Sequence, residues 1–415
     1  MSHLLLDLLS SFSSCLPCLP GSPTLKINSR SFKILRLLGE GGFSYVYLVQ
    51  STSPPNELYA LKKIRCPFGA ESVAQAMKEV EAYKIFGSTP GIIHSVDYSI
   101  ATERGGGEES KTVYVLLPYY KRGNLQDMIN ANLVNHSKFP ERRLMGLFLG
   151  VCKALRGMHV YHGGDNTGGQ GERMEVPGQN KRGGNTVNRG ADQDDEQEQG
   201  RSLLTEDERV TQARETGGKR RSYAHRDIKP GNIMISDSGS DPILMDLGSV
   251  AESPLPITSR SLAIATQDTA AEHSTMPYRA PELFDVKTGT VIDTKVDIWS
   301  MGCTLYACLV GKSPFEMRSD ETGGSLSICV LSGDWRFPDE GPGAKKKKDN
   351  KGKGPVSPGG ASSAAAATAD EEGISEPIRE VVRRCLRVEP SERPDIDELI
   401  EMVEGVLEVL PEDAA

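Results

Sequence analysis

The sequence predicts an α+β protein whose N-terminal part is rich in β-strands and whose C-terminal part is mostly helical. From Phe32 onward apolar and polar residues alternate as they do in half-buried strands, and residues 113–117 form an apolar run typical of a buried strand. Residues 73–86 and 143–159 have the composition and spacing of helices. We therefore expect one helix among the N-terminal strands and a long helix soon after them.

Length and composition indicate one large folded domain. Residues 163–222 are rich in glycine and contain no aromatic residue, and residues 339–373 combine a lysine run with an alanine and serine tract. Such segments bury too little apolar surface to offset the entropy lost on ordering. We predict one domain over residues 29–410, with an N-terminal lobe (29–120), a C-terminal lobe (121–410) and disordered insertions at 163–222 and 339–373.

The charge of the chain argues against nucleic acid as a main partner. The net charge is −9 and the pI is about 5.5, whereas binding to nucleic-acid phosphates needs a surplus of Lys and Arg. The lysine run at 345–348 is either part of a solvated loop or a signal that targets the nucleus or an anionic lipid.

The cysteines are typical of a reducing compartment, because they lack paired metal-ligand spacings apart from Cys15 and Cys18. No apolar run reaches the roughly 18 residues needed to cross a bilayer.

Two short segments, one around Asp227 and one beginning at Asp246, carry residues suited to phosphoryl transfer. This reaction needs an acceptor hydroxyl held in line, metal ions that bridge the phosphates, and positive charge near the transferred oxygens. Asp227 can accept the hydroxyl proton, and Lys229 can lie against the γ-phosphate. Asn232 and Asp246 offer the oxygen ligands that Mg²⁺ prefers. Together the two segments predict a phosphoryl-transfer site.

The order and spacing of these residues resemble the eukaryotic protein kinases. Residues 225–232 have the pattern H-R-D-x-K-x-x-N, and residues 246–248 have the pattern D-x-G. A single His-Arg-Asp triplet often arises by chance, but this succession is much rarer. The resemblance implies the bilobal kinase fold, with a five-stranded antiparallel sheet and one main helix in the N-lobe and a mostly helical C-lobe. Lys229, placed as it is after Asp227, is typical of the Ser/Thr branch.

The resemblance also implies an ATP site in the N-lobe. Residues 39–46 look like the glycine-rich loop over the ATP phosphates, with Ser44 in place of the third glycine, and residues 59–62 look like the strand motif that places a lysine on the phosphates. Leu117 is the expected gatekeeper. The residues expected to contact ATP are Gly39, Glu40, Gly41, Gly42, Val46, Ala60, Lys62, Tyr120 and Met234.

The same resemblance assigns the catalytic groups. Glu79 lies at the usual distance to pair with Lys62, and Glu81 is the rival candidate. The implied catalytic residues are Asp227, Lys229, Lys62 and Glu79, and the implied metal ligands are Asn232 and Asp246.

Further signatures of the family are structural. The activation segment is expected to run from Asp246 to Glu282 and to close with residues 280–282, and Glu282 is expected to pair with Arg393. Asp297 is expected to brace the catalytic loop, which contains residues 225–232. Residues 261–272 match an extra helix in the activation segment, a feature of the branch described next.

Residues 116–123, 223–227, 244–249 and 278–284 are similar to the Numb-associated kinase family, in particular to its small membrane-anchored branch. That branch is typified by serine/threonine-protein kinase sixteen and the fungal palmitoylated vacuolar-membrane kinase. The resemblance implies a non-specific serine/threonine protein kinase that uses ATP with Mg²⁺ or Mn²⁺, phosphorylates Ser and Thr of proteins, and autophosphorylates. It also implies a role in membrane trafficking or in vacuole or Golgi membrane dynamics, at the cytoplasmic face of such a membrane and partly in the cytosol.

Two other functions remain as alternatives. A pseudokinase scaffold on membranes would have lost the lysine, the catalytic aspartate or the metal aspartate, but Lys62, Asp227 and Asp246 are all present. A small-molecule kinase would share the fold, although Lys229 and the segment 280–282 favour protein substrates. The sequence does not identify the substrate.

Residues 1–28 are expected to lie outside the kinase core and to carry a membrane anchor. Leucines at residues 4–9 precede Cys15 and Cys18, a setting in which S-palmitoylation occurs. Ser2 stands where myristoylation would need a glycine, and no positive region precedes the leucines as it would in a secretory signal. The alternatives are an N-terminal helix that packs on the kinase domain, or a redox or metal Cys-x-x-Cys pair.

Overall fold

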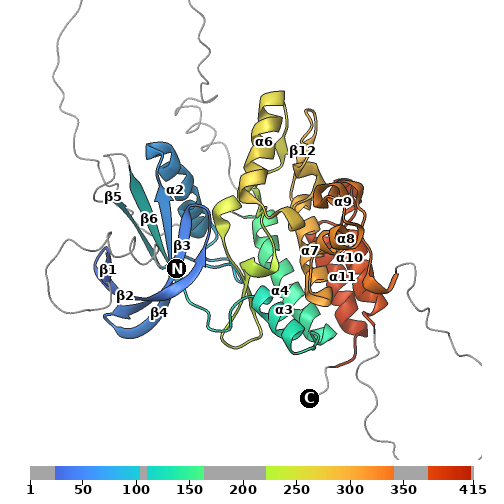
Figure 1. The fold of residues 1–415 in the computed structure, drawn as a ribbon, viewed down its shortest axis with the longest axis horizontal. Helices are drawn as coiled ribbons and strands as arrows, with labels where there is room; N and C mark the ends of the chain where they lie inside the picture. Colours follow the sequence, from blue (N-terminus) through green and yellow to red (C-terminus); the bar gives the residue numbers. More distant parts are fainter. Residues whose placement is uncertain (1–23, 103–109, 163–220, 341–372, 413–415) are drawn as a thin grey trace, which may run out of the picture. The chain divides into compact units, whose positions relative to one another are not determined.

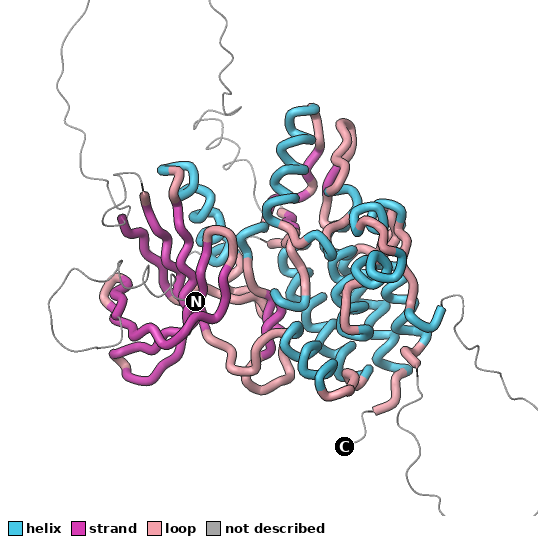
Figure 2. Tube along the Cα trace, viewed as in Figure 1, coloured by secondary structure: helices cyan, strands magenta, loops and turns pink. Residues whose placement is uncertain are grey.

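The computed structural model describes residues 24–102, 110–162, 221–340 and 373–412. The described residues up to Tyr161 and from Ser222 onward belong to one compact unit. Strands dominate the N-terminal part of the compact unit and helices dominate the remainder, as Figure 1 and Figure 2 show. This is the two-lobed α+β arrangement that the sequence predicts.

The N-terminal lobe is a six-stranded antiparallel sheet in the order β1-β2-β3-β4-β6-β5. The strands and the accompanying helix are β1 (Thr24–Ile27), β2 (Arg30–Glu40), β3 (Ser44–Thr52), β4 (Pro55–Cys66), α2 (Gly69–Ile85), β5 (Asp97–Thr102) and β6 (Lys111–Pro118). The predicted helix and buried strand correspond to α2 and β6. Residues 103–109, inside the loop expected between β5 and β6, lie outside the described residues.

The sheet has one strand more than the five expected, because β1 lies inside the stretch 1–28 that we had placed outside the core. Asn28 adopts a positive φ of 51° and turns the chain between β1 and β2. This turn lets Ile27 and Phe32, both fully buried, pack in a small second core on the sheet. Residues 24–28 therefore belong to the folded domain.

The C-terminal lobe is built from helices and short strand pairs. The helices are α3 (Leu125–Val134), α4 (Glu141–His159), α6 (Arg260–His273), α7 (Lys295–Val310), α8 (Pro314–Thr322), α9 (Leu326–Ser332), α10 (Glu376–Cys385) and α11 (Ile396–Val409). The strand pairs are β7 (Ser222–Ala224) with β10 (Ala251–Ser253), β8 (Ile233–Ile235) with β9 (Pro242–Leu244), and β11 (Leu255–Pro256) with β12 (Val291–Ile292). The predicted helices at 143–159 and 261–272 are α4 and α6.

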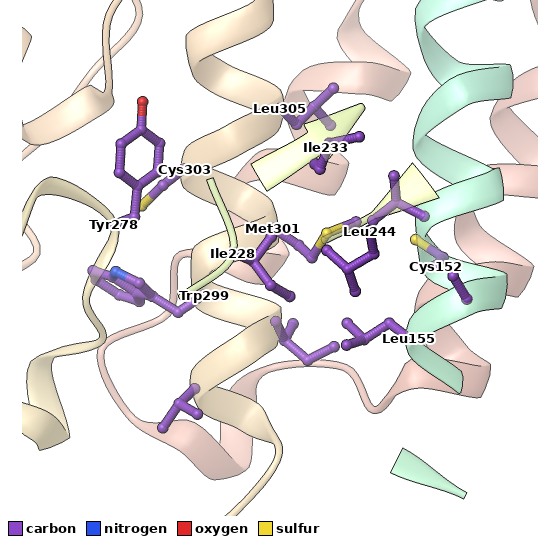
Figure 3. Packing of buried hydrophobic residues seen from close by; sticks show 14 of the residues in the cluster. Cys152, Leu155, Ile228, Ile233, Leu244, Tyr278, Trp299, Met301, Cys303 and Leu305 are labelled. Carbon is purple, nitrogen blue, oxygen red and sulfur yellow. The ribbon is translucent and has the colours of Figure 1, made fainter. Parts of the chain in front are cut away.

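Helix α7 forms the centre of this lobe. It is apolar around nearly its whole circumference, which is typical of a helix buried on all sides. Figure 3 shows its residues Trp299, Met301 and Leu305 in the core together with Leu155 of α4 and Leu244 of β9. This core holds α4, α7 and the β8–β9 hairpin in place. The hairpin lies between Asn232 and Asp246 in the chain.

The chain leaves the core at Tyr161, before the first insertion, and re-enters it beside the same point at Tyr223. The rings of Tyr161 and Tyr223 meet edge to face with 5.7 Å between their centroids, and both also contact Phe86. Ser222, placed by us in this insertion, instead begins β7. The rest of the insertion, up to residue 220, lies outside the described residues.

The second insertion begins later than predicted. Asp339, which we placed inside it, accepts a hydrogen bond of 2.8 Å from Arg379 of α10, and Glu340 binds Arg383 of the same helix. The folded chain thus continues through Glu340, and residues 341–372 lie outside the description. Among the described helices, none is long and apolar enough to span a membrane.

Candidate active site

A partly buried ion cluster joins the sheet, helix α2 and the loop after β9. Lys62 of β4 donates from Nζ to Glu79 Oε1 of α2 and to Asp246 Oδ1, in both cases at 2.8 Å. Glu79 is buried, and its rival Glu81 is exposed. The predicted partner of Lys62 is therefore the one that the fold selects, because only Glu79 faces inward from α2.

The charges in this cluster stabilise one another. The ammonium of Lys62 holds the pKa of Asp246 down to about 2, against the opposing effect of burial. Burial disfavours the charged form of Lys62, but the carboxylates of Asp246 and Glu79 outweigh it and raise its pKa. Asp246 also has a φ of 63°, a left-handed conformation that is uncommon for residues other than glycine and clusters at functional sites.

Asp227 lies at the centre of a second hydrogen-bonded group. Its Oδ2 accepts from Lys229 Nζ at 2.8 Å and from Asn232 Nδ2 at 3.0 Å. Asn232 Nδ2 also donates to the main-chain oxygen of Asp227 at 2.8 Å. The structure therefore brings together the three residues that the sequence placed in the catalytic loop.

Thr275 completes this group and was not predicted from the sequence. Its amide and its hydroxyl both donate to Asp227 Oδ1, at 2.9 Å and 2.7 Å, and its hydroxyl oxygen accepts from Lys229 Nζ at 2.6 Å. The only signal in the sequence was the position of Thr275 shortly before residues 280–282, and no local pattern marks the residue. It links the activation segment to the catalytic loop.

Asp297 braces the backbone of the catalytic loop, as expected. Its carboxylate accepts from the backbone N–H groups of His225 and Arg226 at 2.7 Å and 2.8 Å, and a ring nitrogen of His159 lies 2.9 Å away. Burial would raise the pKa of Asp297, but these donors stabilise the charged form and keep the pKa below its usual value. Arg226 has a φ of 68°, and the bonds to Asp297 secure that unusual conformation.

Asn232 and Asp246 lie on adjacent segments. Met245 N–H donates to the main-chain oxygen of Asn232 at 2.9 Å, and His225 Nε2 donates to the main-chain oxygen of Met245 at 3.1 Å. Because the amide nitrogen of Asn232 already binds Asp227, its amide oxygen is the atom left to face a metal ion. The described residues contain no group of three His, Cys, Asp or Glu side chains that could hold a metal, but Mg²⁺ typically uses one or two protein oxygens and completes its shell with phosphates and water.

Most of the remaining predicted ATP contacts lie on β2, β3 and β4 or in the turn between β2 and β3, whereas Tyr120 follows β6 and Met234 lies on β8. Gly39 and Glu40 end β2, Gly41 and Gly42 form the turn that follows, and Val46 opposes Lys62 in the β3–β4 register. Ala60 opposes Leu117, the expected gatekeeper, in the β4–β6 register. Tyr120 and Met234 are half-buried, as are Val46 and Ala60.

Two hydrogen bonds hold the activation segment together at the C-terminal end of α6. Ser249, just after the segment that begins at Asp246, donates to the main-chain oxygen of His273 at 2.6 Å. Arg279 donates to the main-chain oxygen of Ser274 at 2.8 Å. A cation at a helix C-terminus satisfies carbonyl groups that have no partner within the helix. These bonds place Thr275 beside Asp227.

The two-lobed fold and the groups around Lys62 and Asp227 define a protein kinase. The sequence profile described as "Protein kinase domain" matches residues 32–163 and 220–403. The chain belongs to the protein kinase family, and the predicted fold class is confirmed. Members of this family use ATP and a divalent metal ion.

The relatives narrow the class to the serine/threonine-protein kinases. The chain is 32% identical over 404 residues to serine/threonine-protein kinase ppk13 of Schizosaccharomyces pombe, covering 97% of this chain and 98% of the relative. It is 32% identical over 394 residues to serine/threonine-protein kinase ENV7 of Saccharomyces cerevisiae, covering 92% and 94%. Serine/threonine-protein kinase 16 of Rattus norvegicus is 31% identical over 313 residues, which cover 75% and 80%. The protein is thus a serine/threonine-protein kinase, and the branch inferred from the sequence is confirmed.

Proposed function

We propose that the groups around Lys62 and Asp227 form a single site that transfers the γ-phosphate of ATP to Ser and Thr hydroxyls of proteins, and that the enzyme works at a membrane. The observation that carries the first part is the bonding of Lys62 to both Glu79 and Asp246. This contact links the residues that would hold the phosphates to those that would hold the metal ion.

In this proposal each group acts at a defined atom. The acceptor hydroxyl approaches Asp227, its oxygen bonds to the γ-phosphorus as the bond to the bridging oxygen of ADP breaks, and its proton passes to the carboxylate. Lys229 supplies positive charge beside the transferred group, and Lys62 orients the other phosphates. The Asn232 amide oxygen and the Asp246 carboxylate would hold Mg²⁺, which neutralises the phosphate charge when bound.

Replacing Asp246 with asparagine tests the metal assignment. Asp246→Asn removes a charged ligand while keeping the size of the side chain, so the Mg²⁺ concentration for half-maximal activity should rise by about tenfold or more. The measurement is a Mg²⁺ titration at saturating ATP with a Ser/Thr peptide library as acceptor. Asp320→Asn, an exposed position that pairs only with Lys312 among the described residues, serves as the control. An unchanged Mg²⁺ requirement in Asp246→Asn would argue against the assignment.

The membrane part of the proposal rests on the N-terminal sequence and on the resemblance to the membrane-anchored branch. Cys15 and Cys18 follow an apolar stretch, and both lie outside the described residues. A single acyl chain binds membranes only marginally, whereas two chains anchor stably at about 0.8 kcal/mol per buried methylene. We propose palmitoylation of both cysteines and a location at the cytoplasmic face of the vacuole or Golgi, with autophosphorylation and a role in trafficking.

The double variant Cys15→Ser with Cys18→Ser should move largely to the cytosol, while each single variant should keep part of the membrane fraction. Kinase activity in solution should not change, because these cysteines precede the first described strand. Fractionation, with a hydroxylamine-sensitive acyl assay on the parent protein, measures the effect. A membrane fraction that persists in the double variant would mean attachment by another route.

A further inference from the structure

Tyr83 is a buried residue that contacts the ion cluster and has no role in the site described so far. It lies on α2, one turn after Glu79, and only 1% of its surface is exposed. Its hydroxyl donates to Glu79 Oε1 at 2.7 Å, the same oxygen that accepts from Lys62 Nζ at 2.8 Å. Glu79 therefore receives two donors on one oxygen, one charged and one neutral.

The other oxygen of Glu79 faces the segment that follows Asp246. A Cβ built on Gly248 would lie only 3.2 Å from Glu79 Oε2, so glycine permits this close approach. Helix α2, which carries Tyr83, packs against the turn Leu247–Ser249 that follows Asp246. The Tyr83 hydroxyl therefore holds Glu79 where α2 meets the segment that begins at Asp246.

The Tyr83 hydroxyl matters because the cluster has fewer positive than negative charges. Lys62 brings one positive charge to two carboxylates, those of Glu79 and Asp246. When phosphates draw the ammonium of Lys62 toward themselves, its bond to Glu79 weakens, and among the described residues no other cation is paired with that carboxylate. The Tyr83 hydroxyl stays in place, because it sits on the same helix as Glu79 and its ring is packed in the core.

We propose that Tyr83 is a positioning residue for phosphoryl transfer, whose hydroxyl fixes the Glu79 carboxylate so that Lys62 can hold the phosphates of ATP. The proposal rests on the proposed role of Lys62 and Glu79 in ATP binding. A hydrogen bond to a buried charged group contributes more than one between neutral groups, and its loss leaves the acceptor unsatisfied.

The test is Tyr83→Phe, which keeps the ring and removes only the hydroxyl. We expect kcat/KM for ATP to fall about tenfold, with a higher KM for ATP and an unchanged KM for the peptide acceptor. Partial loss of folded enzyme would lower kcat and leave both KM values unchanged, so the two causes are distinguishable. Tyr306→Phe is the matched control. This tyrosine is also buried, and its hydroxyl donates to the main-chain oxygen of Arg336 in the C-lobe at 2.7 Å. The control variant should lower the melting temperature without changing the KM for ATP.

A double-mutant cycle with Glu79→Ala tests whether Tyr83 acts through Glu79. If it does, Tyr83→Phe should change the KM for ATP by less than about twofold in the Glu79→Ala background. An unchanged KM for ATP in Tyr83→Phe, or a fully additive effect in the cycle, would overturn the inference while Glu79→Ala alone still lowers activity. Wild-type kinetics in Glu79→Ala would overturn the proposed ATP site and this inference together.

Discussion

Replacing Asp227 with alanine is expected to lower kcat by about two orders of magnitude or more. Asp227 is buried, and its two oxygens are held by donors from Lys229, Asn232 and Thr275. The carboxylate is thus fixed where an acceptor hydroxyl could place its proton, and alanine removes that proton acceptor. Steady-state transfer from radiolabelled ATP to a Ser/Thr peptide library measures the loss.

The control for this experiment is Asp285→Ala, at a largely exposed aspartate away from the hydrogen-bonded group. It should leave kcat within about twofold of the wild type. Thermal melting of Asp227→Ala in the presence of ATP should still show stabilisation by the nucleotide, since Lys62 and the strands remain intact. Undiminished turnover in Asp227→Ala would refute the catalytic assignment, and a wild type without transfer would favour a catalytically inactive scaffold.

The largest effect on stability is expected from Arg393→Ala. The Arg393 side chain is 0% exposed and binds both oxygens of Glu282, at 2.7 Å and 2.8 Å. It also donates to the main-chain oxygens of Arg387, Lys295 and Val388. Removing the guanidinium leaves the Glu282 carboxylate and these carbonyls without their donor. A broken buried pair typically costs about 3–5 kcal/mol, which should lower the melting temperature by roughly 10 °C.

The paired variant Arg393→Met with Glu282→Leu separates charge from packing. Because much of the cost comes from the carboxylate left alone, replacing both partners with apolar residues should recover a large part of the lost stability. Differential scanning calorimetry of the three proteins decides this. A melting temperature for Arg393→Ala within about 2 °C of the wild type would contradict the expectation.

The sequence by itself determined the fold class and the chemical groups of the site. The helical spacing of residues 73–86 and 143–159 predicted α2 and α4 to within a few residues, because helical periodicity is a local property. Lys62, Asp227 and Asp246 could be named because phosphoryl transfer requires particular side chains and the family keeps them in a fixed order.

The pairing of Glu282 with Arg393 was expected from the family resemblance, but other contacts between distant segments were decided by the tertiary structure alone. Thr275 reaches Asp227 across 48 positions of the chain, and His159 meets Asp297 across 138. Strand β1 was missed because a four-residue strand has too short a pattern to recognise, and it is stable only when Ile27 packs against the rest of the sheet. No sequence pattern indicated that the Tyr83 hydroxyl would bond to Glu79 in the cluster around Lys62. Local periodicity and motif order are encoded in neighbouring residues, whereas these contacts exist only after folding has buried their partners together.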